Sequence, residues 1–171
     1  MIALPRLAAL LFGLIIFCPS IRADDTDKIF AADLQRLFTA VKTNDFDTPI
    51  DMMYSPVLEA SGGRDAMRKE AGQLKEKFSA IGLKYVSMDS VPPYQRVTTT
   101  ANDYVIIPTH IVIDAGLHRF ETNGYELAIK AHHSSKWEYM DGAGITPEMR
   151  SSFFPDLKDT VLPEVKRKKL Y

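Results

Sequence analysis

Histidine and tyrosine are two residue types in this chain that could perform acid–base chemistry. His110 lies among aliphatic residues in the alternating segment 103–114, and apolar surroundings lower the pKa of a histidine and can make it a base. Asp114 is about 13 Å away along the same strand, so the two cannot form a direct dyad. We assign no catalytic residue outright. If the protein is an enzyme, we expect His110 to act with Tyr85 or Tyr125, whereas the alternative is a hydrogen-bonded structural histidine.

Aromatic side chains with polar ends are numerous and could line a ligand pocket. Pockets for small molecules are mainly apolar and carry a few polar groups. Ordinary packing in a core or an interface is the alternative explanation. We predict a site for a small apolar molecule that is lined by Tyr54, Tyr85, Tyr125 and Trp137.

Charge and ligand chemistry argue against several function classes. The formal net charge is −1, so no basic field attracts nucleic acid. His132 and His133 are adjacent, and adjacent strand residues point to opposite faces, so the pair cannot easily hold one ion. No cysteine or carboxylate stands at a spacing that would complete a zinc site. We expect no nucleic-acid partner, no metal and no cofactor, and we interpret the histidine pair as a solvated turn.

Residues 1–23 have the pattern of a secretory signal peptide. A basic residue precedes an apolar run over 7–17, and Ala23 stands before two aspartates, as is typical of a leader that is cut after a small residue. The run is shorter than the roughly 20 residues of a membrane span, although an uncleaved anchor is the alternative. Cleavage would remove Cys18, the only cysteine. We therefore expect one domain over 24–171, periplasmic or secreted, with no stable membrane anchor.

Hydrophobic periodicity first has the helical spacing. An apolar stripe that begins at Phe30 predicts a helix over 26–43. Asp47 starts a short second helix that Pro56 ends, because proline disfavours helical geometry in the preceding residue. A Ser-Gly-Gly break at 61–63 separates it from a third, charged helix.

The period then changes to alternation, which predicts four or five consecutive strands. The segments are 83–91, 94–100, 103–114, 118–133 and 136–142. Pro108 indicates a bulge or an edge position, and Asn123-Gly124 indicates a bend or, alternatively, a hairpin turn. We interpret the basic run at 166–169 as a solvated terminus. Consecutive strands with helices on one side predict an α+β fold, in which a curved, mostly antiparallel sheet wraps the N-terminal helices.

The order of these elements is distinctive, and five stretches carry it. They are KTNDFDTPIDMMYSP (42–56), GGRDAM (62–67), YVIIPTHIVI (104–113), YELAIKAHHSSKWEYMDG (125–142) and FFPDL (153–157). In them the chain resembles the nuclear transport factor 2-like superfamily, also called SnoaL-like or cystatin-like, and in particular its small secreted bacterial members without an assigned reaction. The resemblance implies a cone-shaped fold. The superfamily contains isomerases, dehydratases, cyclases, scaffold domains and binding proteins, so the fold sets no function. Its enzymes place an Asp, His or Tyr in the cone, and none of their motifs matches this chain residue by residue.

We therefore expect a binding protein that holds a small apolar ligand in the cone or a protein partner, such as a second copy in a homodimer, on the sheet face. The second hypothesis is an isomerase- or dehydratase-type enzyme with a His/Tyr site in the cone. A dimeric adaptor with a filled cone is the third. The first two differ in one observation, which is whether His110 and a tyrosine hydroxyl converge inside a closed cavity.

Overall fold

The computed structural model describes residues 25–171, and the predicted signal peptide, 1–23, lies outside the described residues. The helices of this part are α1 (Asp25–Lys42), α2 (Asp47–Met52), α3 (Ser55–Ala60), α4 (Gly63–Ala80) and α5 (Pro147–Phe153). The strands are β1 (Leu83–Ser90), β2 (Gln95–Thr98), β3 (Asn102–Ala115), β4 (His118–Ala131), β5 (Glu138–Asp141) and β6 (Lys166–Lys169). Two short 3-10 turns, η1 (Gly142–Gly144) and η2 (Pro155–Leu157), flank α5.

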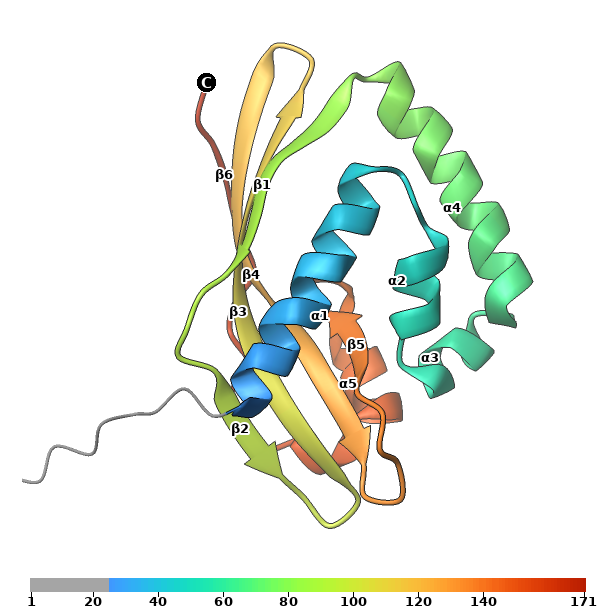
Figure 1. The fold of residues 1–171 in the computed structure, drawn as a ribbon, viewed down its shortest axis with the longest axis vertical. Coiled ribbons are helices and arrows are strands. Elements are labelled where there is room, and N and C mark those ends of the chain that lie inside the picture. The colour runs from blue at the N-terminus through green and yellow to red at the C-terminus, as the bar shows by residue number, and fades with distance from the viewer. Residues whose placement is uncertain (1–24) are drawn as a thin grey trace, which may run out of the picture.

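A curled antiparallel sheet forms the centre of the molecule (Figure 1). β3 and β4 pair along their whole length. β1 and β2 both pair with the outer side of β3, and β5 and β6 both pair with the outer side of β4. The helix α1 lies across one face of this sheet, which we call the α1 face, and α5 lies behind the opposite face, which we call the α5 face (Figure 1). The α+β class and the antiparallel sheet that were predicted are thus confirmed.

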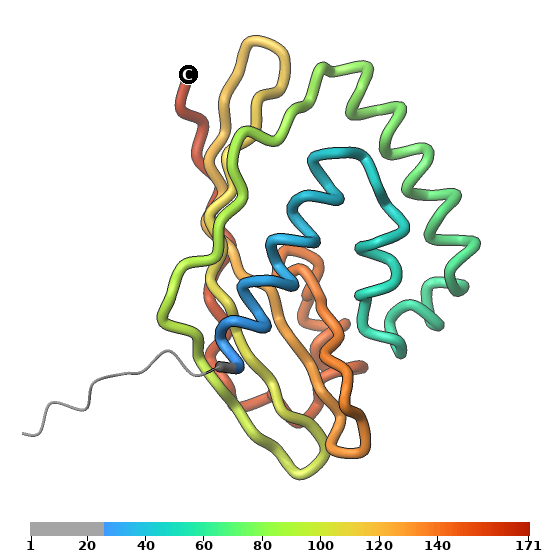
Figure 2. Tube along the Cα trace, viewed as in Figure 1, coloured from blue at the N-terminus to red at the C-terminus, as the bar shows by residue number. Residues whose placement is uncertain are grey.

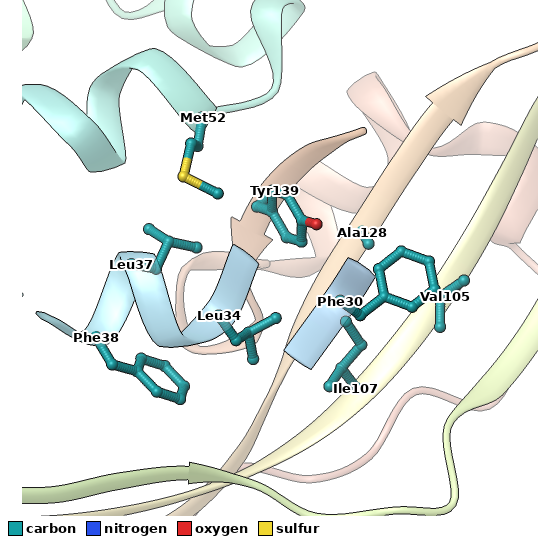
Figure 3. Close-up of a cluster of buried hydrophobic side chains, with 9 residues drawn as sticks. All are labelled: Phe30, Leu34, Leu37, Phe38, Met52, Val105, Ile107, Ala128 and Tyr139. Carbon is teal, nitrogen blue, oxygen red and sulfur yellow. The ribbon is translucent and has the colours of Figure 1, made fainter. Parts of the chain in front are cut away.

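The core on the α1 face confirms the apolar stripe of the first helix. Phe30 and Leu34 are 0% and 1% exposed, and they pack against Val105 and Ile107 of β3 (Figure 3). Because α1 places residues three and four apart on one side, a single stripe covers the sheet. Full burial of one such side chain contributes about 1.5–3 kcal/mol.

The segment after α1 contains one more helix than the sequence predicted. Pro56 was expected to end a helix, but it lies in the first turn of α3, whose N-cap is Tyr54. Proline is well placed there because the first N–H groups of a helix have no intrahelical partner. Gly62, with φ +89°, and Gly63, with φ +80°, then adopt left-handed geometry between α3 and α4, as the Ser-Gly-Gly break indicated.

The central strand β3 tolerates Pro108 because of the gap between β1 and β2. Its register with β4 continues without a bulge through Pro108, which pairs with Tyr125. The carbonyl oxygen of Pro108 accepts a hydrogen bond from the Val91 N–H, so its nitrogen points to the same outer side, between β1 and β2. The missing N–H therefore falls where no ladder continues. The register also runs straight through Asn123 and Gly124, which excludes a hairpin turn at that point.

The C-terminal segment returns across the α5 face and ends in a strand (Figure 2). Residues 166–169, interpreted from the sequence as a solvated terminus, form β6 and pair with residues 120–123 of β4. Their side chains are exposed as expected, but their backbone is ordered because β5 covers only residues 126–129 of β4. The free edge of β4 beyond β5 therefore offers unpaired backbone groups to this run.

Candidate functional site

A pocket of about 580 Å³ lies between the α5 face and the C-terminal segment. We call it the C-terminal pocket. It is lined by Tyr125, Gly142, Ala143, Ile145, Thr146, Pro147, Arg150, Ser151, Phe154, Pro155, Lys158, Leu162, Pro163 and Val165. This volume falls in the range of small-molecule sites, and the combination of apolar walls with a few polar groups is typical of them.

Local structure explains how the chain builds this pocket. The hydroxyl of Thr146 accepts a hydrogen bond from the Met149 N–H at 3.2 Å, and Pro147 follows in the first turn, so α5 begins there. The Nη2 of Arg150 then donates to the carbonyl oxygens of Leu157, Lys158 and Thr160. These bonds fix the chain after α5 and so hold residues 158–165 over the sheet.

The floor of the pocket depends on a close contact between Tyr125 and Gly142. A Cβ atom at Gly142 would lie only 2.5 Å from Cε1 of the tyrosine ring. Tyr125 is 3% exposed, so its ring has little room to move away. The absence of a side chain at position 142 therefore lets the ring lie flat against the backbone of η1.

The pKa of Tyr125 depends on burial and on two charged neighbours. Burial raises the pKa of its hydroxyl, the charge of Arg150 opposes that increase, and the charge of Asp141 adds to it. Arg150 is thus close enough to the hydroxyl for its charge to act on it.

The α1 face carries a second group of polar residues, which sequence reasoning missed. Glu126 pairs directly with Asp141 across β4 and β5, and alternation places both side chains on the α1 face with Ala128 and Tyr139. Burial, followed by the nearby charge of Asp141, raises the pKa of Glu126 to about 8. No hydrogen bond or ion pair joins the carboxyl group of Glu126 to another of the described residues. The only signal in the sequence was an acid at a strand position whose neighbours are apolar on both faces.

Two tyrosines extend this α1-face group. The hydroxyl of Tyr139 donates to Asp33 of α1, and burial together with this bond raises the tyrosine pKa. Figure 3 shows Tyr139 between Met52 and Ala128 in the core. Burial and then the charge of Asp141 raise the pKa of Tyr85. Tyr85 also lines a smaller pocket of about 290 Å³ between α1, α4 and β1.

The structure does not bring His110 together with a tyrosine in a closed cavity. His110 points to the α5 face, where its Nε2 lies 3.2 Å from Oε1 of Glu121, and its side chain is 34% exposed. Tyr85 lies on the other face. Tyr125 shares the α5 face, but His110 is absent from the residues that line the pocket below it. The contact with Glu121 and the partial exposure of His110 fit a hydrogen-bonded structural histidine better than a catalytic base.

The four residues expected to line one ligand site divide between the two faces. Tyr125 lines the C-terminal pocket, and Tyr54 stacks on Phe154 beside it with ring centroids 5.4 Å apart. Trp137 packs edge-to-face on Phe30 at 4.8 Å on the α1 face, the face to which Tyr85 also belongs. The sheet therefore separates the four residues, because successive side chains of a strand point to opposite faces.

Residues 25–171 show no clustered metal-ligand side chains and no helix that could span a membrane. This part contains no group of three or more His, Cys, Asp or Glu side chains that could hold a metal ion. His132 and His133 are exposed, and His132 lies 3.6 Å from Asp103. None of the helices between residues 25 and 171 combines the length and apolar character needed to cross a membrane.

Comparison with known proteins gives no relative from which a role could be transferred. No family model, no curated protein and no solved structure matches this chain. A function must therefore be argued from the two sites alone.

Proposed function

We propose that this protein binds a small apolar molecule, and that the C-terminal pocket is the site. One observation carries the proposal, namely the pocket of about 580 Å³ with walls from Tyr125, Phe154, Leu162 and Val165. Aromatic and aliphatic walls bind by removing apolar ligand surface from water. The site thus lies on the α5 face, on the side of the sheet opposite α1.

The proposal includes the setting in which the protein works. The curled sheet around α1 and the order of elements support a nuclear transport factor 2-like cone. The composition of residues 1–23 supports export to the periplasm or beyond. A chain with a carrier role in that compartment would meet small apolar molecules that water dissolves poorly.

A matched pair of variants tests the pocket. Leu162 lines it, whereas its neighbour Val161 is 83% exposed and does not. We expect 1-decanol to bind the protein purified from the cells in which it is naturally made. Binding should change the NMR chemical shifts of Tyr125 and Val165 most. Leu162→Trp should obstruct the pocket and weaken binding, and Val161→Trp should leave binding intact. Equal binding by both variants would place the ligand elsewhere.

Native mass spectrometry of the same preparation adds an independent readout. A retained small-molecule mass that Leu162→Trp loses supports the carrier role. A bare mass at twice the protomer would instead favour a homodimer or another protein partner. Much of the α5 face is covered in the folded chain, since Ile106 is 1% exposed beneath Phe154 and Leu157. Such a partner would therefore have to bind the part of this face near His110.

A second candidate function rests on Glu126. A carboxyl group with a pKa of about 8 remains protonated at neutral pH and can donate a proton, and its ionised form is a base of matched strength. Together with Asp141 and Tyr85 it could serve an isomerase or dehydratase reaction, in which a proton leaves the carbon next to a carbonyl group. This arrangement replaces the expected His110 site with a carboxyl site on the α1 face.

Deuterium exchange tests this second candidate. In D2O, the wild-type protein should speed deuterium uptake next to the carbonyl of 3-penten-2-one above the buffer rate. Glu126→Gln should remove the acceleration, and Glu121→Gln on the opposite face should retain it. Uptake that is the same with and without the protein argues for a carboxyl group without a catalytic role.

A further inference from the structure

The lining of the C-terminal pocket is positively charged. Arg150 and Lys158 are its cationic members, and none of the described residues that line it is acidic. No ion pair joins either cation to a carboxylate within residues 25–171. A partly desolvated cation without a counter-charge is costly, so the lining favours a ligand that carries a negative charge.

The contacts of Arg150 leave part of its guanidinium group free. All three of its hydrogen bonds are made by Nη2, to the carbonyl oxygens of Leu157, Lys158 and Thr160. Its Nε is buried without a partner. Its Nη1 also has no partner but is not enclosed, since it is absent from the buried unpaired atoms. Neutral carbonyls hold the group in place, and Nη1 remains available to an anionic oxygen.

Position and polarity divide the pocket into two ends. The charge of Arg150 acts more strongly on the hydroxyl of Tyr125 than the opposing charge of Asp141 does, so the cationic end lies near that hydroxyl. Phe154, Leu162 and Val165 supply apolar surface around it. A ligand that fits both ends has an apolar body and one anionic group.

We propose that the C-terminal pocket takes an amphiphilic carboxylate, with a carboxylate oxygen that accepts a hydrogen bond from Nη1 of Arg150 and an apolar body against Phe154, Leu162 and Val165. The inference rests on the proposed function and adds the chemical class of the ligand. Charge-assisted bonds from arginine to carboxylate are short and strong, and Lys158 adds attraction. Alkyl and aryl carboxylates share this chemistry.

Matched acids and alcohols separate the carboxylate from the apolar body. Calorimetric titrations compare decanoate with 1-decanol for the alkyl source, and 4-phenylbutyrate with 4-phenylbutanol for the aryl source. The wild-type protein should bind the preferred acid at least about tenfold more tightly than its alcohol, as one charge-assisted hydrogen bond warrants. Sodium chloride at 0.5 M should weaken binding of the acid and not of the alcohol.

Variants of Arg150 and Lys158 test whether these two cations cause the preference for the acid. Arg150→Gln should reduce the affinity for the acid to that for the alcohol, while Arg150→Lys should retain part of the preference. Because Arg150 also anchors the chain after α5, Arg150→Gln could disturb the pocket and lose the alcohol as well. Lys158→Gln, at an exposed residue, then provides the readout, with acid binding about threefold weaker and alcohol binding unchanged.

Three results would overturn the inference in different ways. Equal wild-type affinities for acid and alcohol would refute the anionic ligand and leave the proposed binding function standing. Failure of all four molecules to bind would refute both. A preference for the acid that survives both Arg150→Gln and Lys158→Gln would show that the carboxylate does not meet these cations.

Discussion

Replacement of Glu126 by glutamine should stabilise the protein in neutral and alkaline solution and leave it unchanged in acid. In the folded protein the pKa of Glu126 is about 8, against 4.5 for a free glutamate side chain. Between these values the native state holds a proton that the unfolded state has released. Stability must therefore fall as the pH rises through this window. Below pH 4.5 both states are protonated, and the difference disappears.

The size of the effect follows from the width of the window. Each pH unit within it removes about 1.4 kcal/mol from the free energy of unfolding. From 4.5 to about 8 the loss amounts to at most about 5 kcal/mol, and residual contact of Glu126 with water makes it smaller. A domain of this size has a total stability of about 5–15 kcal/mol. Glutamine has nearly the shape of the protonated acid and cannot ionise, so it avoids the loss.

Urea unfolding followed by the fluorescence of Trp137 measures this difference. Wild type, Glu126→Gln and the control Glu59→Gln, at an exposed position of α3, are compared from pH 4.5 to 9. The gap between wild type and Glu126→Gln should open steadily toward pH 8, while Glu59→Gln should follow the wild type. A gap that stays constant over this range would refute the desolvated, unpaired state of Glu126.

Further predictions concern stability at neutral pH, measured by urea unfolding. Tyr139→Phe should lower the free energy of unfolding by about 1–3 kcal/mol, because the carboxylate of Asp33 loses its buried donor; an unchanged midpoint would mean that water replaces the hydroxyl fully. Gly142→Ala should cost about 1–3 kcal/mol, since its Cβ would overlap the ring of Tyr125. Gly72→Ala, in α4 with nothing within 4 Å of its added Cβ, should instead raise stability by about 1 kcal/mol. If both alanine variants shift the midpoint in the same direction, the close contact at Gly142 does not govern the outcome.

Local patterns were sufficient for most of the fold. The helical stripe from Phe30 fixed which side of α1 meets the sheet, since a period near 3.6 leaves only one apolar side. Alternation in 103–114 likewise set β3 and its two faces. The boundary at Pro56 was misplaced because proline is compatible both with the end of one helix and with the first turn of the next. Strand β6 was missed because its formation depends on the free edge of β4, which composition does not encode.

The sequence by itself determined the α+β class and the antiparallel order, because these depend on neighbours within a few residues. Only the tertiary structure decided where a ligand could bind. The C-terminal pocket joins Tyr125, Arg150 and Val165, which meet only when the chain after α5 folds back over the sheet. The raised pKa of Glu126 likewise arises from burial and from Asp141 on the next strand. Burial and charge proximity are sums over residues distant in the chain, so the pattern around any one residue does not contain them.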